Sequence, residues 1–324
     1  MEKFSFLMRW INLIQIVACS VIGLFFVICL LFGTDETFLK TERKTTNAQY
    51  VPWDIYDLKQ ANEFDYQCVQ MKSEPETPIC IYPDVEDKFI SRSILQTGMW
   101  EPKGVECMQN VLRNNSDLGL IDIGTNIGVF SLLAAAMGRN VLSVEPRLES
   151  ARRFHKSVKL GHLEDRVTLI TNALNNKRGT CGLVLNRVNQ GNIKIVEADR
   201  DEETNATDKE MHAQCITMND LVPLCKFKRA IMKIDIEGRE PRALAAADRL
   251  FDAIDIPYIM MEWHLINRIL LESTSDEEQA FAIEMVRFLD ERDYVPESIG
   301  RVPLNIFKMN GWPGNVIWKK NTII

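Results

Sequence analysis

Two glycines and several polar residues stand together in one short stretch, Asp122-Ile123-Gly124-Thr125-Asn126-Ile127-Gly128. An apolar run precedes this stretch and a helical pattern follows it. Gly124 suits a tight turn with a positive φ, and Gly128 lets a ligand or the sheet approach the backbone closely. Because open α/β sheets bind ligands beyond the carboxyl ends of their strands, this spacing predicts a ligand-binding turn.

The chemistry of this turn differs from that of a dinucleotide site. The fingerprint G-x-G-x-x-G is absent, because Thr125 and Asn126 follow the first glycine. Asp122 opens the turn, and an acid at this point suits a cationic or hydroxyl-rich ligand better than a pyrophosphate. Glu145 ends the next predicted strand, where an acid can accept hydrogen bonds from ribose hydroxyls. The alternative is a plain strand, turn and helix with a solvated acid.

A second group of ionisable residues follows two later predicted strands. Asp235 and Glu237 end the strand predicted at 230–235 and are expected to face the same crevice. One of them could act as a general base while the other binds substrate or holds structure. The alternative for Glu237 is that it fixes a turn at the following glycine. His264 follows the next strand and is a third candidate base, with a structural role as its alternative.

The sequence predicts no metal site. The four histidines are scattered and the chain contains no Cys-x-x-Cys pair, whereas zinc sites usually show such spacings. A divalent ion held by Asp235, Glu237 and Glu262 is the alternative. Trp263 follows the last of these acids and could either stack on a sugar face or belong to the core.

Apolar runs alternate with helical patterns from residue 118 onward. Strands are predicted at 118–123, 140–145, 167–170, 230–235, 258–262 and 315–319, and helices at 129–137, 148–160, 242–251 and 275–292. This order predicts an α/β fold with a mostly parallel sheet and helices on both faces. The polar stretch between residues 174 and 214 indicates an insertion or a hairpin.

The N-terminal region has the pattern of a membrane anchor. Residues 10–32 contain no charged residue, which is about the length of a helix that crosses a bilayer. Bulky apolar residues continue to the end of this run, which favours an uncleaved transmembrane helix over a signal peptide. The chain is therefore expected to comprise a short tail (1–9), a transmembrane anchor (10–32), a stem (33–66), a lead-in segment packed on the main domain (67–117) and the α/β domain (118–324).

Cysteines and sequons favour a lumenal domain. An even number of cysteines follows the anchor, and they could form disulfides in an oxidising compartment: Cys68, Cys80, Cys107, Cys181, Cys215 and Cys225. Asn114 and Asn205 each begin an N-glycosylation sequon. We therefore expect a single-pass membrane protein of the Golgi or endoplasmic reticulum. Positive charges on the two sides of the anchor are nearly balanced and do not decide its orientation. The net charge of -7 argues against a nucleic-acid partner.

Four segments, in order, resemble motifs of the FkbM family of S-adenosylmethionine-dependent methyltransferases. Residues 120–131 look like its motif I, and Val144-Glu145-Pro146 resembles its second motif. Residues 232–240 resemble its K-x-D-x-E-G-x-E signature, and residues 259–264 resemble the strand that follows. The matched stretches run from about residue 118 to residue 318. The insertion near residues 186–208 departs from a minimal family domain, so the resemblance assigns no substrate contacts there.

The resemblance implies a Rossmann-like methyltransferase fold and S-adenosyl-L-methionine as the cofactor. Asp122 and the backbone of the turn from Gly124 through Asn126 to Gly128 would hold its methionine portion. Glu145 would hold the ribose. Asn172 follows the third strand and would lie near the adenine, with a simple turn residue as the alternative reading.

The resemblance also implies methyl transfer, commonly to a hydroxyl oxygen of a sugar or natural product. The expected acceptor is therefore a glycan or a small molecule with a hydroxyl group. A protein or lipid methyltransferase on the same fold is one alternative. A catalytically inactive, membrane-tethered binding protein is the other. The oligomeric state does not follow from the sequence.

Overall fold

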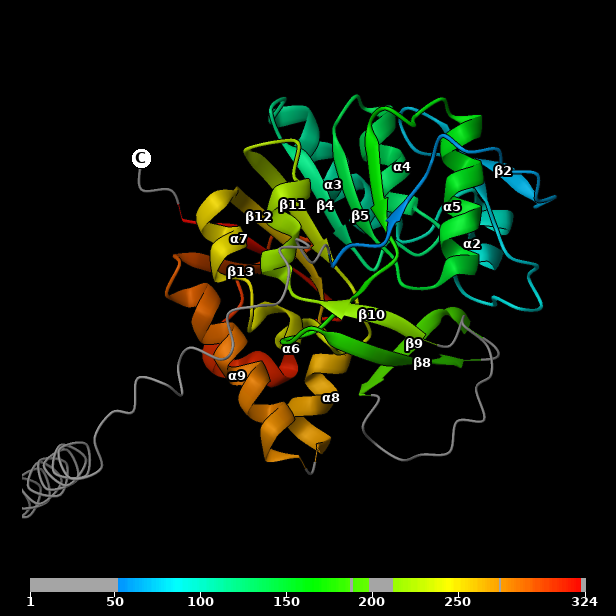
Figure 1. Cartoon of the computed structure of the whole chain (residues 1–324). Coiled ribbons are helices and arrows are strands. Elements are labelled where there is room, and N and C mark those ends of the chain that lie inside the picture. The colour runs from blue at the N-terminus through cyan, green and yellow to red at the C-terminus, as the bar shows by residue number, and fades with distance from the viewer. Residues whose placement is uncertain (1–51, 187–188, 198–211, 274, 322–324) are drawn as a thin grey trace, which may run out of the picture. The chain divides into compact units, whose positions relative to one another are not determined.

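The computed structural model describes residues 52–186, 189–197, 212–273 and 275–321 (Figure 1). The chain from Pro52 onward forms one compact unit. The predicted membrane anchor at residues 10–32 and most of the predicted stem lie outside the described residues. Within the described part, no helix combines the length and the apolar character that crossing a bilayer requires. The predicted domain boundaries stay predictions.

An eight-stranded sheet forms the centre of this unit, in the order β1-β6-β5-β4-β11-β12-β14-β13. Its strands are β1 (Ile55–Tyr56), β4 (Gly119–Ile123), β5 (Val141–Val144), β6 (Val167–Ile170), β11 (Arg229–Ile234), β12 (Asp255–Glu262), β13 (Tyr294–Ser298) and β14 (Asn315–Lys320). The five strands from β6 to β12 pair in parallel, and β1, β13 and β14 pair antiparallel at the two edges. The prediction of a mostly parallel α/β sheet is therefore confirmed, and all six predicted strands are present.

Helices cover both faces of the sheet, because its central strands are apolar on both sides. On one face lie α3 (Pro102–Asn114), α4 (Val129–Ala136) and α5 (Leu148–Leu160), whose buried side chains pack with Leu120 of β4. On the other face, α6 (Glu240–Leu244), α7 (Asp248–Ala253) and α9 (Asp276–Asp290) pack with Ile121 and Ile123. Asp122 alternates with these two isoleucines along β4 and therefore faces the α4 side.

The helical predictions need two corrections. The helix predicted at 242–251 is two short helices, α6 and α7, which are separated by residues 245–247. The sequence pattern did not predict α8 (His264–Glu272), which begins directly after β12. The three-tryptophan cluster of Trp263, Trp312 and Trp318 fills the core beside α8, and its ring centroids lie 4.6 to 6.1 Å apart.

The segment predicted as an insertion or hairpin folds into a second sheet. Strands β7 (Ala173–Leu174), β8 (Gly179–Asn186), β9 (Asn189–Glu197) and β10 (His212–Ile216) pair in the order β7-β10-β8-β9. β8 and β9 form the expected hairpin, and a disulfide joins Cys181 of β8 to Cys215 of β10. Figure 1 shows this small sheet below the central sheet in that view. Two 3₁₀ helices complete the described elements, at Met218–Leu224 and Ile306–Gly311.

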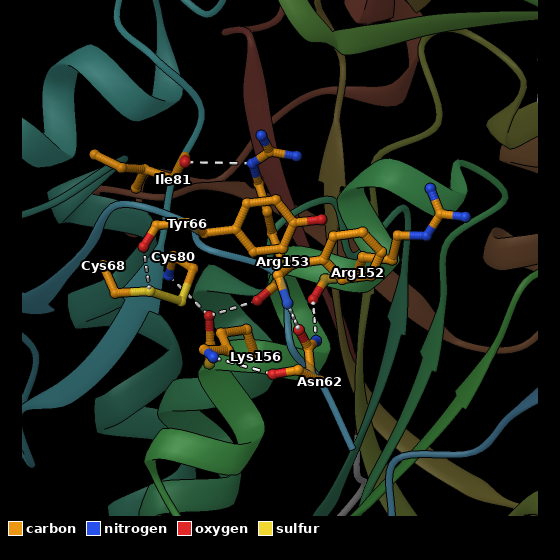
Figure 2. Close-up of a disulfide and its surroundings, with 10 residues drawn as sticks. Asn62, Tyr66, Cys68, Cys80, Ile81, Arg152, Arg153 and Lys156 are labelled. Atoms are coloured by element: carbon orange, nitrogen blue, oxygen red, sulfur yellow. Dashed lines mark hydrogen bonds between the residues drawn. A yellow bond between two sulfur atoms is a disulfide. The ribbon is translucent and has the colours of Figure 1, made fainter. Parts of the chain in front are cut away.

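The lead-in segment packs on α5 of the main domain (Figure 2). Its strands β2 (Cys68–Met71) and β3 (Thr77–Cys80) are joined by a disulfide between Cys68 and Cys80, and α2 (Ile90–Thr97) follows them. The Arg153 side chain of α5 donates to the Ile81 carbonyl oxygen, 3.2 Å away. Its guanidinium also lies 4.3 Å from the centre of the ring of Tyr66, the residue directly before this segment, in a cation–π contact. Charge and aromatic contacts thus fix this segment beside the domain.

Candidate functional site

A cavity of about 470 Å³ opens at the carboxyl ends of β4, β5, β11 and β12. The turn after β4 and the acids that follow β11 and β12 line the same cavity. This is where open α/β sheets bind ligands, and the volume suits a small organic ligand. The structure brings together these predicted residues: Gly124, Asn126, Glu145, Asp235, Glu237 and His264.

The turn after β4 needs glycine at its first position. Gly124 has φ 81°, and a Cβ atom there would lie only 1.9 Å from the carbonyl oxygen of Asp235. Gly128 has φ 99°, and its Cβ would lie 2.2 Å from the Phe154 ring. Asn126, between them, also has a positive φ, of 53°. The glycines therefore let the turn lie directly against β11 and α5.

Glu145 holds the turn from the end of the neighbouring strand. Its carboxylate accepts hydrogen bonds from the backbone N–H groups of Asn126, at 2.8 Å, and Arg147, at 2.9 Å. The side chain lines the cavity, yet only 4% of the residue is exposed. Burial raises the pKa of Glu145 to about 7, against the opposing effect of the two N–H donors. Each carboxylate oxygen has a second lone pair, so the group can still accept hydrogen bonds from ligand hydroxyls.

Asp122 does not line the cavity. Its carboxylate is buried on the α4 side and accepts a 2.5 Å hydrogen bond from Ser131 Oγ, which in turn contacts Ser143 Oγ at 2.8 Å. Burial raises the pKa of Asp122, and Lys233 and the Ser131 hydroxyl oppose this rise. The structure therefore places Asp122 beneath the turn, where it supports α4 rather than facing a ligand in the cavity.

Asn172 does not line the cavity either. It is fully buried, and its amide donates to the carbonyl oxygens of Pro52 and Gln214, both at 3.1 Å. Its side-chain oxygen accepts from the backbone N–H of Asp54 at 2.8 Å. These three contacts join the start of the compact unit to the strand ends. The alternative reading of Asn172, as a structural turn residue, fits this position better than adenine binding.

A buried lysine pairs with the first candidate base. Lys233 Nζ donates to Asp235 Oδ2 at 2.8 Å, and it lies 5.0 Å from the centre of the Phe130 ring. The pKa of Lys233 is raised, because the charges of Asp235 and Glu101 outweigh the effect of burial. Lys233 belongs to the motif that carries the family resemblance, but local spacing does not predict this ion pair inside the cavity.

Several acids beside Asp235 have raised pKa values. Burial raises the pKa of Glu237 to about 7, and the Asp235 charge adds to this rise. Burial likewise raises the pKa of Glu240 to about 8 and that of Glu262 to about 9, with the charge of Asp235 again contributing. Glu237 also has φ 57°, at the turn before Gly238.

His264 and Trp263 follow β12 but have different surroundings. His264 is the first residue of α8, is exposed and lines the cavity, so it remains a candidate base. Trp263 is fully buried and its indole N–H donates to the Met309 carbonyl oxygen at 2.9 Å. Of its two predicted roles, the core role is therefore confirmed and sugar stacking is wrong.

The lead-in segment and the hairpin contribute walls that sequence reasoning missed. Trp100 and Glu101 come from the lead-in, and Ile193 and Ile195 come from β9. Arg239 donates to the carbonyl oxygen of Ile195 and so ties the hairpin to the start of α6. The alternating isoleucines of β9 were the available signal, because residues two apart share one face of a strand.

The residues at the turn fit the cofactor that the motif resemblance implies. Glu145 offers a buried carboxylate that can accept from two ribose hydroxyls, and the turn beside it has no side chain at Gly124. Apolar side chains of Ile127, Val129 and Phe130 line the same part of the cavity. S-adenosylmethionine combines a nucleoside with a cationic sulfonium, and acidic residues occupy the opposite side of the cavity.

Comparison with known proteins identifies the family. The Methyltransferase FkbM domain model matches residues 122–296, more than half of the chain. An O-methyltransferase from Bacillus cereus in complex with SAH is 12% identical, covers 71% of this chain and 89% of its own, and has a TM-score of 0.41. The methyltransferase FkbM from Methylobacillus flagellatus KT is 15% identical and has a TM-score of 0.38. The match covers 63% of this chain and 43% of the other. No curated protein matches the chain. Structural similarities this low carry no argument, so the assignment rests on the domain match. The chain belongs to the FkbM methyltransferase family and is an S-adenosylmethionine-dependent methyltransferase.

Proposed function

We propose that this protein transfers the methyl group to a hydroxyl oxygen of a glycan or small molecule. One observation carries the proposal: the turn after β4 and the acids at the ends of β11 and β12 line a single cavity. An acceptor hydroxyl is a weak nucleophile, so it needs a base nearby when the methyl group arrives. Asp235, Glu237 and His264 are the described candidates for that base.

The reaction balances without an oxidant or reductant. Bound S-adenosylmethionine would supply the methyl group of its sulfonium. The acceptor oxygen would bond to the methyl carbon as the carbon–sulfur bond breaks, and neutral S-adenosylhomocysteine would leave. The hydroxyl proton moves to a side chain in the cavity. Glu145 and the turn after β4 orient the cofactor, and Lys233 holds Asp235 in place through its 2.8 Å ion pair. Positioning of this kind supplies much of the rate enhancement in enzymes with two bound reactants.

In the test, the purified full-length chain is incubated with labelled S-adenosylmethionine. Panels of glycans, small alcohols, lipids and peptides are supplied as acceptors. Product analysis should place the label on oxygen, in an ether. Asp235→Asn, Glu237→Gln and His264→Asn are then compared with the wild type. Removal of the true base should lower turnover by roughly 10²–10⁴-fold and leave cofactor affinity nearly unchanged.

Glu284→Gln is a suitable control for these three variants. Glu284 is an exposed carboxylate on α9, outside the cavity, and its replacement should change neither turnover nor cofactor affinity. Near-normal turnover in all three cavity variants would refute a side-chain base. Label found on peptide nitrogen or on a carboxylate would instead refute the hydroxyl acceptor and favour a protein methyltransferase.

We also propose that the domain works in the lumen of the Golgi or endoplasmic reticulum, on a single-pass anchor at residues 10–32. Two disulfides support this location, because bonded cysteines persist in oxidising compartments. Cys107 and Cys225 are not bonded in the structure. Asn114, the first residue of one sequon, is exposed at the end of α3.

The location predicts a chemical signature in secretory cells. Glycosidase treatment should increase the gel mobility of the wild type, and Asn114→Gln or the equivalent change at Asn205 should reduce that shift. Alkylation without reductant should spare Cys68, Cys80, Cys181 and Cys215. A protein that is insensitive to glycosidase and whose four thiols are all alkylated would place the domain in the cytosol.

A further inference from the structure

Three carboxylates from three elements meet at the base of the cavity. Asp235 follows β11, Glu240 begins α6, and Glu262 ends β12. One oxygen of each lies within 4.8 Å of the corresponding oxygens of the other two. Of this carboxylate triad, Asp235 and Glu262 line the cavity. The triad differs from the trio considered from the sequence, because Glu240 takes the place of Glu237.

Two oxygens of the triad are buried without a hydrogen-bond partner among the described residues. Glu240 is 0% exposed; its Oε1 accepts from the Ile236 N–H at 2.8 Å, but its Oε2 has no partner. Glu262 Oε2 is likewise buried and has no hydrogen-bond partner among the described residues. A buried acceptor without a partner lowers stability, and it does so more when it is charged. Either a proton or a cation can supply the missing contact to these two oxygens.

The charges around the triad leave room for a divalent cation. Lys233 is the cation bonded to it, through Asp235 Oδ2 at 2.8 Å. Lys233, whose ammonium group also faces Glu101, balances at most one of the three negative charges that the triad carries once a cation has replaced its protons, so at least two remain uncompensated. A monovalent partner leaves one of these unbalanced, whereas a divalent ion balances both. Carboxylate oxygens are the ligands that hard divalent ions such as Mg²⁺, Mn²⁺ and Ca²⁺ prefer.

We propose that Asp235, Glu240 and Glu262 form a binding site for a divalent cation of the Mg²⁺ or Mn²⁺ type. Glu240 closes the site from the buried side. The remaining coordination positions face the cavity, where water or an acceptor hydroxyl can occupy them. The bound ion would lower the pKa of an acceptor hydroxyl and fix its oxygen beside the cofactor. This role deepens the proposed function, whereas binding of the ion does not depend on it.

The test measures metal binding directly. The full-length chain is stripped with EDTA, dialysed and titrated with MnCl₂ while electron paramagnetic resonance follows free Mn²⁺. We expect saturable binding of one Mn²⁺ per chain, competed by Mg²⁺. Glu240→Gln and Glu262→Gln should each weaken Mn²⁺ binding by about tenfold or more, since each removes a charged ligand.

Glu237→Gln is the matched control. It removes a cavity carboxylate of the same type that lies beside the triad but outside its set of ligand oxygens. Its Mn²⁺ affinity should stay within about threefold of the wild type. Thermal unfolding shows whether each variant is folded, and cofactor affinity, measured by calorimetry, should be nearly the same in all of them.

Two results would overturn the site. One is the absence of saturable Mn²⁺ binding by the folded wild type up to about 1 mM, the weak end of protein Ca²⁺ sites. The other is a larger loss of affinity in Glu237→Gln than in Glu240→Gln and Glu262→Gln. Because neither measurement involves an acceptor, failure of the metal site is distinguishable from failure of the hydroxyl acceptor.

Discussion

Glu145 should make cofactor affinity rise with pH. Its pKa is raised to about 7 by burial, so much of the free protein carries a neutral Glu145 below this pH. Ribose hydroxyls donate to the ionised carboxylate, and binding therefore favours the charged form. The sign follows directly: affinity is low where Glu145 is protonated and increases as pH rises through 7.

The expected size follows from the same pKa. With a pKa of about 7, roughly one molecule in eleven has an ionised Glu145 at pH 6 and roughly ten in eleven at pH 8. If only the ionised form binds well, the affinity for S-adenosylmethionine rises about tenfold over this range. The α-amino group of the cofactor titrates near pH 8 as well, so a variant is needed to isolate the Glu145 contribution.

Calorimetric titrations of wild type and Glu145→Gln between pH 6 and pH 8 test this prediction. The variant should bind more weakly and lose the tenfold rise. Glu237→Gln, whose carboxylate lies on the acceptor side with a pKa also near 7, should keep it. A wild-type affinity that is flat with pH, or a full rise that persists in Glu145→Gln, would refute the role of this carboxylate.

Two further variants test the positions of individual residues. Gly124→Ala should lower the melting temperature and weaken cofactor binding more than tenfold. The new Cβ would lie 1.9 Å from the Asp235 carbonyl oxygen, and the left-handed backbone conformation of a residue with a side chain costs about 1–2 kcal/mol more. Gly138→Ala is its control, with the same φ of 81° but nothing within 4 Å of the Cβ; equal effects of the two changes would contradict the close approach. Asn172→Ala should lower the free energy of unfolding by about 2–3 kcal/mol, since it leaves three backbone groups without partners, while cofactor affinity at 25 °C changes less than twofold. Denaturant unfolding and calorimetry measure both effects, and a cofactor defect without a loss of stability would restore Asn172 to the adenine site.

The sequence alone determined the sheet and the glycine turn after β4, because both depend on local patterns. Short apolar runs that alternate with helical patterns predict buried strands in a sheet covered on both faces, and each of the six predicted strands lies in the central sheet. Gly124 and Gly128 were recognisable because their positive φ angles favour a residue without a side chain. The spacing of Glu145 after the next strand likewise placed it beside the turn, because parallel strands end at one edge.

Tertiary structure decided which polar residues face the cavity. Asp122 and Glu145 both end strands beside the turn, yet Asp122 points toward Ser131 and Glu145 lines the cavity, and only packing distinguishes them. Asn172 is occupied by backbone groups as distant in sequence as Pro52, a contact that no local pattern reports. The approach of Glu240 to Asp235 and Glu262 depends in the same way on how α6 packs against β11 and β12. Contacts between segments far apart in sequence are set by the packing of whole elements, which is why local spacing predicted the strand ends but could not predict the triad.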